Sequence, residues 1–306
     1  MDTISRVVLG TCSKLGWVGR MWRLTSFFFA LAAGLLAASQ ASAGNPNFVV
    51  YEFRTEKQGT KEIYVFSDYS TNAPDDPNYT AQLLELEYAV TDRLETSFYL
   101  DGGAESGDGG YRYRGFHFET RYRPFDNVFL NPTFYGEYEN LEPDHLYLFE
   151  ALGRSDTPEP RGPESTEHEL ETRLILGQSV SDRLALLFNW INEASFDNGR
   201  TEFGYATGLD YLLYGSNKET GYGRHRAAGG RNWELEKMRL GVEVFGGLGD
   251  SVLGLTLDPK ITAQYAGVNL RTEFENGISF TIGGTAGLTD VAEQALVRMK
   301  VGYEFH

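Results

Sequence analysis

The chain contains one cysteine among its 306 residues, Cys12. Cys12 lies in the leader described below, so the rest of the chain offers no disulfide, thiolate nucleophile or thiolate-based zinc site. Nothing after residue 43 approaches the roughly 20 consecutive apolar residues that a membrane-spanning helix needs. Positive charge is also scarce, with 27 lysines and arginines against 43 acidic residues. This excess of negative charge disfavours nucleic acid as a partner.

The N-terminus has the three-part pattern of a secretory signal. Arg20 and Arg23 precede an apolar run over residues 24–36, and Ala41-Ser42-Ala43 follows as a cleavage motif. The pattern predicts a signal peptide over 1–43 cleaved near Ala43, rather than an anchor, because the apolar core is short. The first 20 residues are unusually long for a basic leader, so Met21 is an alternative start. Cleavage changes the formal charge from -16 to -19, and a lumen with that excess would attract cations.

From residue 60 onward the sequence alternates with period two in segments of roughly ten residues, the length of a tilted transmembrane strand. Leu86 and Tyr88, for example, share one face of a strand while Glu85 and Glu87 share the other. A soluble β-sandwich alternates in the same way. The signal peptide, the lack of cysteine and the aromatic residues at strand ends favour a membrane barrel. Such barrels average out as hydrophilic, which agrees with the mean hydropathy of -0.35.

The pattern predicts an all-β fold, a closed antiparallel transmembrane β-barrel of about twelve strands over residues 60–306. An even number brings both ends of a single-chain bacterial barrel to the periplasm. Residues 48–53 also look strand-like, but a thirteenth strand would break this parity, so 44–59 is predicted to be a periplasmic N-terminal lead-in. The expected strands are 60–69, 80–90, 94–102, 111–123, 128–139, 168–180, 184–194, 201–213, 236–247, 260–274, 277–289 and 295–305.

Turn lengths predict the orientation. Four tight turns, at 91–93, 124–127, 181–183 and 275–277, recur in constant phase and are assigned to the periplasmic side. Opposite connections such as 103–110 and the acidic 140–167 are longer, as extracellular loops are. The connection 214–234 conflicts with this rule, because parity makes it periplasmic although it is long.

Several hairpins resemble a group of Gram-negative outer-membrane barrels, described as transporters, that includes the phenol-degradation MetA-pathway barrels. The likeness lies in Glu87-Tyr88-Ala89-Val90-Thr91-Asp92-Arg93-Leu94-Glu95, in Val180-Ser181-Asp182-Arg183-Leu184, in residues 242–250 and 287–290, and in Val301-Gly302-Tyr303-Glu304-Phe305. The resemblance covers about the last two-thirds of the mature chain and implies a transporter-like barrel in the outer membrane. It also implies that Tyr303 and Phe305 engage the barrel-assembly machinery, although His306 follows where such barrels usually end on an aromatic residue.

The inward face of the predicted strands is rich in charge. By parity it carries 17 acids against eight bases. One interpretation is a water-filled pore that favours cations; the other is an interior plugged by paired charges, since buried charge must find a partner. The lumen-lining candidates are Glu85, Glu87, Glu95, Asp101, His117, Glu119, Arg121, Arg123, Glu169, Glu171, Arg173, Glu202, Asp210, Glu243, Arg271, Glu273, Arg298 and Lys300.

Catalytic signatures are absent from the sequence. None of His117, His145 and His168 is followed by a serine on the same strand face, as a barrel hydrolase would need. Period-two spacing explains the pair Glu85 and Glu87 without glycosidase chemistry. The glycines at 246–249 are expected in a hairpin, because no helix follows to bind phosphate. The acidic loops near Asp75 and over 142–167 lack ordered calcium-ligand spacing.

The sequence therefore predicts an outer-membrane channel or transporter for small hydrophilic or amphipathic solutes. The alternatives are a closed structural barrel that displays surface loops and, third, an outer-membrane enzyme. No cofactor or metal is expected. The expected partners are outer-membrane lipid, lipopolysaccharide and the assembly machinery, and the sequence does not identify the solute.

Overall fold

The computed structural model describes residues 47–71, 78–105, 110–126, 128–141, 167–216 and 233–305. The predicted signal peptide, most of the loop 142–167, His145 and His306 lie outside these ranges. The described residues belong to the second of two compact units, Ser39–His306. Within them, no helix is long and apolar enough to cross a membrane.

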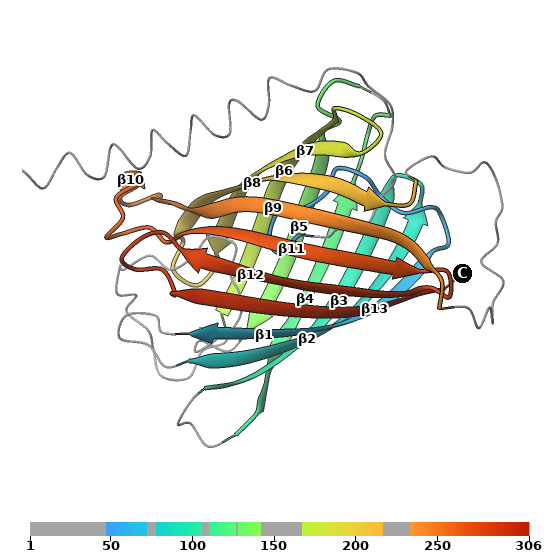
Figure 1. The fold of residues 1–306 in the computed structure, drawn as a ribbon. Coiled ribbons are helices and arrows are strands. Elements are labelled where there is room, and N and C mark those ends of the chain that lie inside the picture. Colours follow the sequence, from blue (N-terminus) through green and yellow to red (C-terminus); the bar gives the residue numbers. More distant parts are fainter. Residues whose placement is uncertain are drawn as a thin grey trace, which may run out of the picture. The chain divides into compact units, whose positions relative to one another are not determined.

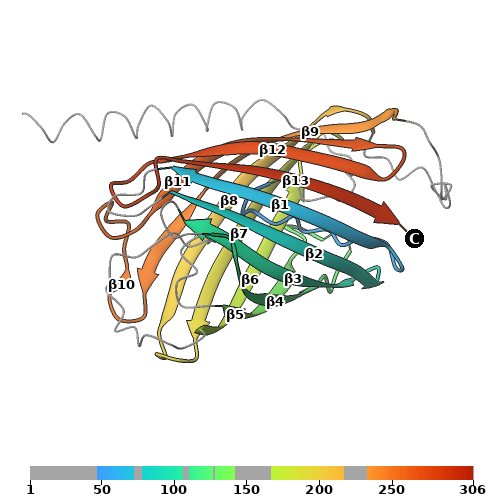
Figure 2. The same cartoon turned by 90° about the horizontal axis from the view of Figure 1, so that it is seen from below.

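Twelve long strands form one closed antiparallel barrel (Figures 1 and 2). Each long strand pairs with the next along the chain, and β1 pairs with β13 to close the sheet. The two-residue β10 only extends the hairpin after β9. The strands are β1 Lys61–Thr71, β2 Tyr79–Thr91, β3 Leu94–Glu105, β4 Arg112–Tyr122, β5 Thr133–Leu141, β6 Glu167–Ser179, β7 Leu184–Ser195, β8 Thr201–Tyr214, β9 Leu235–Asp250, β10 Gly254–Leu255, β11 Gln264–Phe274, β12 Ile278–Gly287 and β13 Ala295–Phe305.

The predicted all-β fold and the count of twelve barrel strands are confirmed, with differences at two strand starts. β5 begins at Thr133 rather than 128, because Leu130 and Asn131 have positive φ angles of 61° and 30° that interrupt an extended chain. β11 begins at Gln264 rather than 260, after a turn in which the amides of Ile261 and Thr262 donate to the carbonyl of Asp258.

The doubtful connection 214–234 joins two neighbouring strands. β8 and β9 pair directly from Glu202↔Asp250 to Tyr214↔Met238, so no strand is missing between them. Residues 217–232 of the connection lie outside the described ranges. It leaves the barrel at the same end as the tight turns, where β1 begins and β13 ends. That end is called the turn end below.

Burial alternates along the strands as the period-two pattern requires. Leu86, Phe118 and Met299 are exposed on the outer face, with 44%, 49% and 52% of their surfaces accessible. Their neighbours Glu87 and Glu119 are buried on the inner face. The barrel is thus apolar outside and charged inside, the reverse of a water-soluble protein.

The N-terminal segment 47–58 does not lie outside the barrel. Phe48, Val50 and Phe53 are buried in the main apolar cluster together with Ile175, Leu187 and Phe245 from the barrel wall. The segment hydrogen-bonds to inward side chains of β3, β4 and β13. Only a segment inside the barrel can reach all of these strands. The described residues 47–58 therefore lie inside the barrel, and not in the periplasmic position expected for the lead-in 44–59. The physical reason is that an apolar run such as Phe48-Val49-Val50 gains free energy by burial.

Candidate functional site

The charged interior is the candidate site, and all eighteen predicted lumen-lining residues are buried or half-buried. Thirteen are at most 9% exposed. The five half-buried residues are Arg123, Glu169, Glu202, Arg298 and Lys300. Arg123 lies at the rim, where it pairs with Asp126 at 3.5 Å in the turn before β5.

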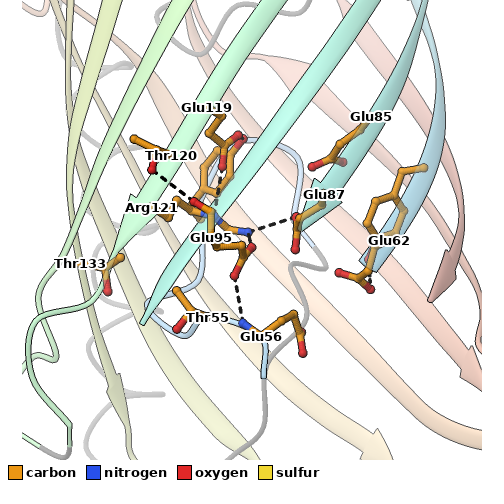
Figure 3. Close-up of polar contacts among 12 residues, drawn as sticks. Thr55, Glu56, Glu62, Glu85, Glu87, Glu95, Glu119, Thr120, Arg121 and Thr133 are labelled. Atoms are coloured by element: carbon orange, nitrogen blue, oxygen red, sulfur yellow. Dashed lines mark hydrogen bonds and ion pairs between the residues drawn. The ribbon is translucent and has the colours of Figure 1, made fainter. Parts of the chain in front are cut away.

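Arg121 on β4 is the centre of the first ion cluster (Figure 3). Its guanidinium donates to Glu95, lies 3.3 Å from Glu87 Oε2 and has its Nε 3.0 Å from Glu119 Oε1. Three carboxylates from β2, β3 and β4 thus share one cation. Glu95 also accepts the backbone N–H of Glu56 at 2.9 Å, so the cluster holds the N-terminal segment where it enters the barrel.

Arg173 on β6 forms a second cluster at mid-height. It donates to both carboxylate oxygens of Glu171, one of them at 3.0 Å, and to the carbonyl of Val49 at 2.9 Å. Its guanidinium carbon also lies 4.7 Å from the ring centroid of Tyr51 and 4.9 Å from that of Tyr135. Ion pairing and cation–π contact together therefore fix this buried arginine.

The remaining bases concentrate on β9, β11 and β13. Arg298 makes a bidentate pair with Asp68, at 2.7 and 2.6 Å, and donates to the carbonyl of Phe48 at 2.8 Å. Lys300 lies 3.4 Å from Glu85 Oε2. On β11 and β9 the further pairs are Arg271 with Glu273, at 3.1 Å, and Arg239 with Asp210. These bases thus lie on one group of neighbouring strands, β9 to β13.

Glu243 on β9 anchors the N-terminal segment. Its carboxylate is 1% exposed and accepts the backbone N–H groups of Phe48, Val49 and Val50 at 2.6, 2.9 and 3.1 Å. Asn189 on β7 continues the contact: its Oδ1 accepts the N–H of Tyr51 at 2.6 Å, and its Nδ2 donates to the carbonyl of the same residue at 3.1 Å. The segment therefore occupies the interior at the mid-height of the barrel. The contacts of Glu243 and Asn189 with the segment were not predicted from the sequence; the apolar run at 48–51 was the available signal.

Strand register places the acids in one continuous row around the wall. Starting from β13, ten successive cross-strand positions carry nine carboxylates and one serine, Ser97 on β3. The row climbs from the turn end to the opposite end of the barrel, because tilted strands make any cross-strand row rise. Its members are Glu304, Glu62, Glu87, Glu119, Glu137, Glu171, Glu193, Glu202 and Asp250. We call it the acidic row.

No family model matches the chain, and no curated protein matches it either. Solved structures do match. The COG4313 outer membrane channel from Pseudomonas putida F1 has a TM-score of 0.49 and 12% identity, covering 85% of this chain and 100% of that one. The KdgM porin in complex with oligogalacturonate has a TM-score of 0.48 and 10% identity, covering 80% and 99%. LpxR from Salmonella typhimurium has a TM-score of 0.40 and 12% identity, covering 80% and 99%.

The first of these proteins is a channel and the second a porin, but at 12% identity or less and TM-scores under 0.5 the likeness transfers no activity to this chain. The narrower resemblance to phenol-degradation barrels stays a prediction. What the structure defines is a class: a closed antiparallel barrel with an apolar outer face, a charged interior and an N-terminal segment inside.

Proposed function

We propose that this protein is an outer-membrane channel for small hydrophilic or amphipathic solutes, and that it favours cations. The observation that carries the proposal is the acidic row, which runs from one end of the barrel interior to the other. A closely spaced row of carboxylates needs positive charge and water near it, because buried charge without a partner is costly. Fixed wall charge of this sign attracts and selects cations.

The N-terminal segment 47–58 is the proposed closing element of the channel. It lies in the interior through hydrogen bonds to Glu243, Asn189 and Arg173. Conduction then requires that this segment move or leave a passage beside it. The same observation favours one alternative, a closed structural barrel in which the segment is permanent packing.

Conductance in planar bilayers tests the proposal. The wild type and a variant lacking residues 47–58 are compared under a salt gradient. Cation-selective steps in the wild type support an open channel, and steps in the shortened variant alone support a channel closed by the segment. The absence of conductance in both proteins would contradict the channel proposal and leave the structural barrel as the alternative. Neutralising Glu85 and Glu87 together to glutamine serves as a selectivity control, since it should lower the cation preference and leave the barrel folded, while Glu95, which accepts the amide of Glu56, stays in place.

The apolar outer face supports a location in the outer membrane. We propose further that the chain is cleaved near Ala43, that lipid and lipopolysaccharide surround the barrel, and that Tyr303 and Phe305 engage the assembly machinery. The mature protein should fractionate with outer membranes and migrate differently on gels before and after boiling. Recovery as a soluble periplasmic protein would contradict the proposal.

An outer-membrane enzyme remains the third candidate, and the described histidines do not favour it. His117 contacts Asp101 and Glu137, and His168 hydrogen-bonds to Tyr138 and Asn140. Neither arrangement is a serine–histidine pair.

A further inference from the structure

Three potential metal ligands converge on the wall between β4 and β5. His117 stands directly across from Glu139 in the register, and Glu137, a member of the acidic row, lies two positions along β5. One ligand atom from each of the three residues lies within 4.8 Å of the others. His117 and Glu137 are buried, with 9% and 7% of their surfaces accessible, and Glu139 is half-buried.

Asp101 on β3 lies beside the other nitrogen of the imidazole. Its Oδ2 lies 2.7 Å from Nε2 of His117, and the aspartate is 2% exposed. A carboxylate this close to Nε2 stabilises a proton on that nitrogen, although the two atoms are at ion-pair distance without the alignment of a hydrogen bond. In the neutral ring, Nδ1 then carries the lone pair and points toward the two glutamates. Metal-bound histidines are oriented in this way, with a carboxylate behind the ring and the metal in front.

The spacing in front of the ring leaves room for an ion. Nδ1 of His117 is 3.6 Å from Glu137 Oε1, longer than a hydrogen bond. Two donor atoms that each lie about 2.0–2.2 Å from one metal ion are separated by a gap of this size. Two carboxylates and an imidazole lone pair meeting at one point require a positive charge between them, which is a proton on the ring, a proton shared by the two carboxyl groups, or a cation.

We propose that His117, Glu137 and Glu139 bind one divalent transition-metal ion of the Zn²⁺ or Co²⁺ type, with Asp101 positioning the histidine. Imidazole nitrogen with carboxylate oxygen suits these ions better than Mg²⁺ or Ca²⁺, which prefer oxygen alone. Three protein ligands leave a coordination position for water or a solute. The site could not be predicted from the sequence, because His117 and Glu139 are 22 positions apart and only the register brings them together.

Metal binding is measured on the folded protein in detergent, prepared without a polyhistidine tag and treated with a chelator. Titration with Zn²⁺ by calorimetry, and with Co²⁺ by visible absorption, should give one site per chain. His117→Gln should abolish this site. Asp101→Asn, which removes no ligand, should weaken the affinity about 10–100-fold. Glu193→Gln, on the same acidic row at β7, is the matched control and should bind like the wild type.

Two results would overturn the site: no stoichiometric binding by the wild type, or equal binding by wild type and His117→Gln. Heat-modifiable migration of each variant shows whether it is folded, and Glu139→Gln provides a second ligand variant if His117→Gln is not. The site does not depend on the channel proposal. A barrel that conducts but binds no Zn²⁺ refutes the site alone, and a silent barrel that binds Zn²⁺ refutes the channel alone.

Discussion

Replacing Glu243 with alanine should release the N-terminal segment from the barrel interior. The glutamate accepts three backbone N–H groups, from Phe48, Val49 and Val50, in a place where it is 1% exposed. Hydrogen bonds to a charged group contribute about 1.5–3 kcal/mol each, and they are not additive. Some of these amides will find water once the carboxylate is gone. We therefore expect the docked state to lose roughly 3–6 kcal/mol relative to the released state.

Cysteine labelling can report this change, because the mature chain is expected to carry no cysteine of its own. Val50 has no accessible surface, so Val50→Cys should react with a maleimide only when the segment leaves its place. Since about 1.4 kcal/mol is tenfold in an equilibrium constant, Glu243→Ala should speed labelling of Val50→Cys by about a hundredfold or more. Glu243→Gln keeps one acceptor oxygen and should have an intermediate effect.

A matched background is available in Glu193→Ala, which removes another inward carboxylate, one that stands between Glu171 and Glu202 in the register. Labelling in that background should stay as slow as in Val50→Cys alone. Equal labelling rates with and without Glu243 would refute the anchoring function of the carboxylate. Immediate labelling of Val50→Cys with Glu243 intact would refute the placement of the segment itself.

Three further predictions concern the wall. Leu86→Arg should lower the free energy of unfolding by about 2–4 kcal/mol if the residue is near the bilayer midplane, whereas Glu87→Gln should cost less. Urea titrations in lipid compare the two variants, and equal losses would contradict the assignment of faces. Neutralising Glu85 with Glu87 should move the reversal potential toward zero in dilute salt, and an unchanged potential would remove them from the ion path. A Cβ at Gly177 would lie 1.9 Å from a ring atom of Phe53, whereas one at Gly136 meets nothing within 4 Å. Gly177→Ala should therefore destabilise by about 1–3 kcal/mol and Gly136→Ala should not, as thermal melts can show.

The inner and outer faces of the barrel could be predicted from sequence because a strand has a fixed period of two. Once Leu86 is assigned outward, Glu85 and Glu87 must point inward, whatever the neighbouring strands do. Strand ends depend on local backbone conformation instead, and the positive φ angles at Leu130 and Asn131 leave no clear mark in the composition. That is why the start of β5 was misplaced by five residues.

Contacts between strands could not be predicted in the same way. Whether Glu137 stands beside Glu119 or beside its neighbour depends on the stagger of the sheet, and one position of slip would change every pair. The acidic row and the convergence of His117 with Glu139 are therefore properties of register. The position of residues 47–58 could not be predicted either, because it depends on tertiary packing. An apolar run of this length fits a strand, a lead-in or an interior segment equally well.

The two main features of the interior should respond differently to salt, and this separates closure from selectivity. The acidic row acts on mobile ions through its field, which is screened over about 8 Å at physiological salt and about 3 Å at 1 M. The N-terminal segment is held by buried contacts of 2.6–3.1 Å, from its amides to Glu243 and from Arg173 to its carbonyl. Such short buried bonds are screened far less. Raising salt from 0.1 to 1 M should therefore abolish most of the cation preference in reversal potentials while leaving the labelling rate of Val50→Cys nearly unchanged. If labelling accelerated in parallel with the loss of selectivity, long-range attraction between the acidic wall and the segment, rather than these hydrogen bonds, would hold the segment in place.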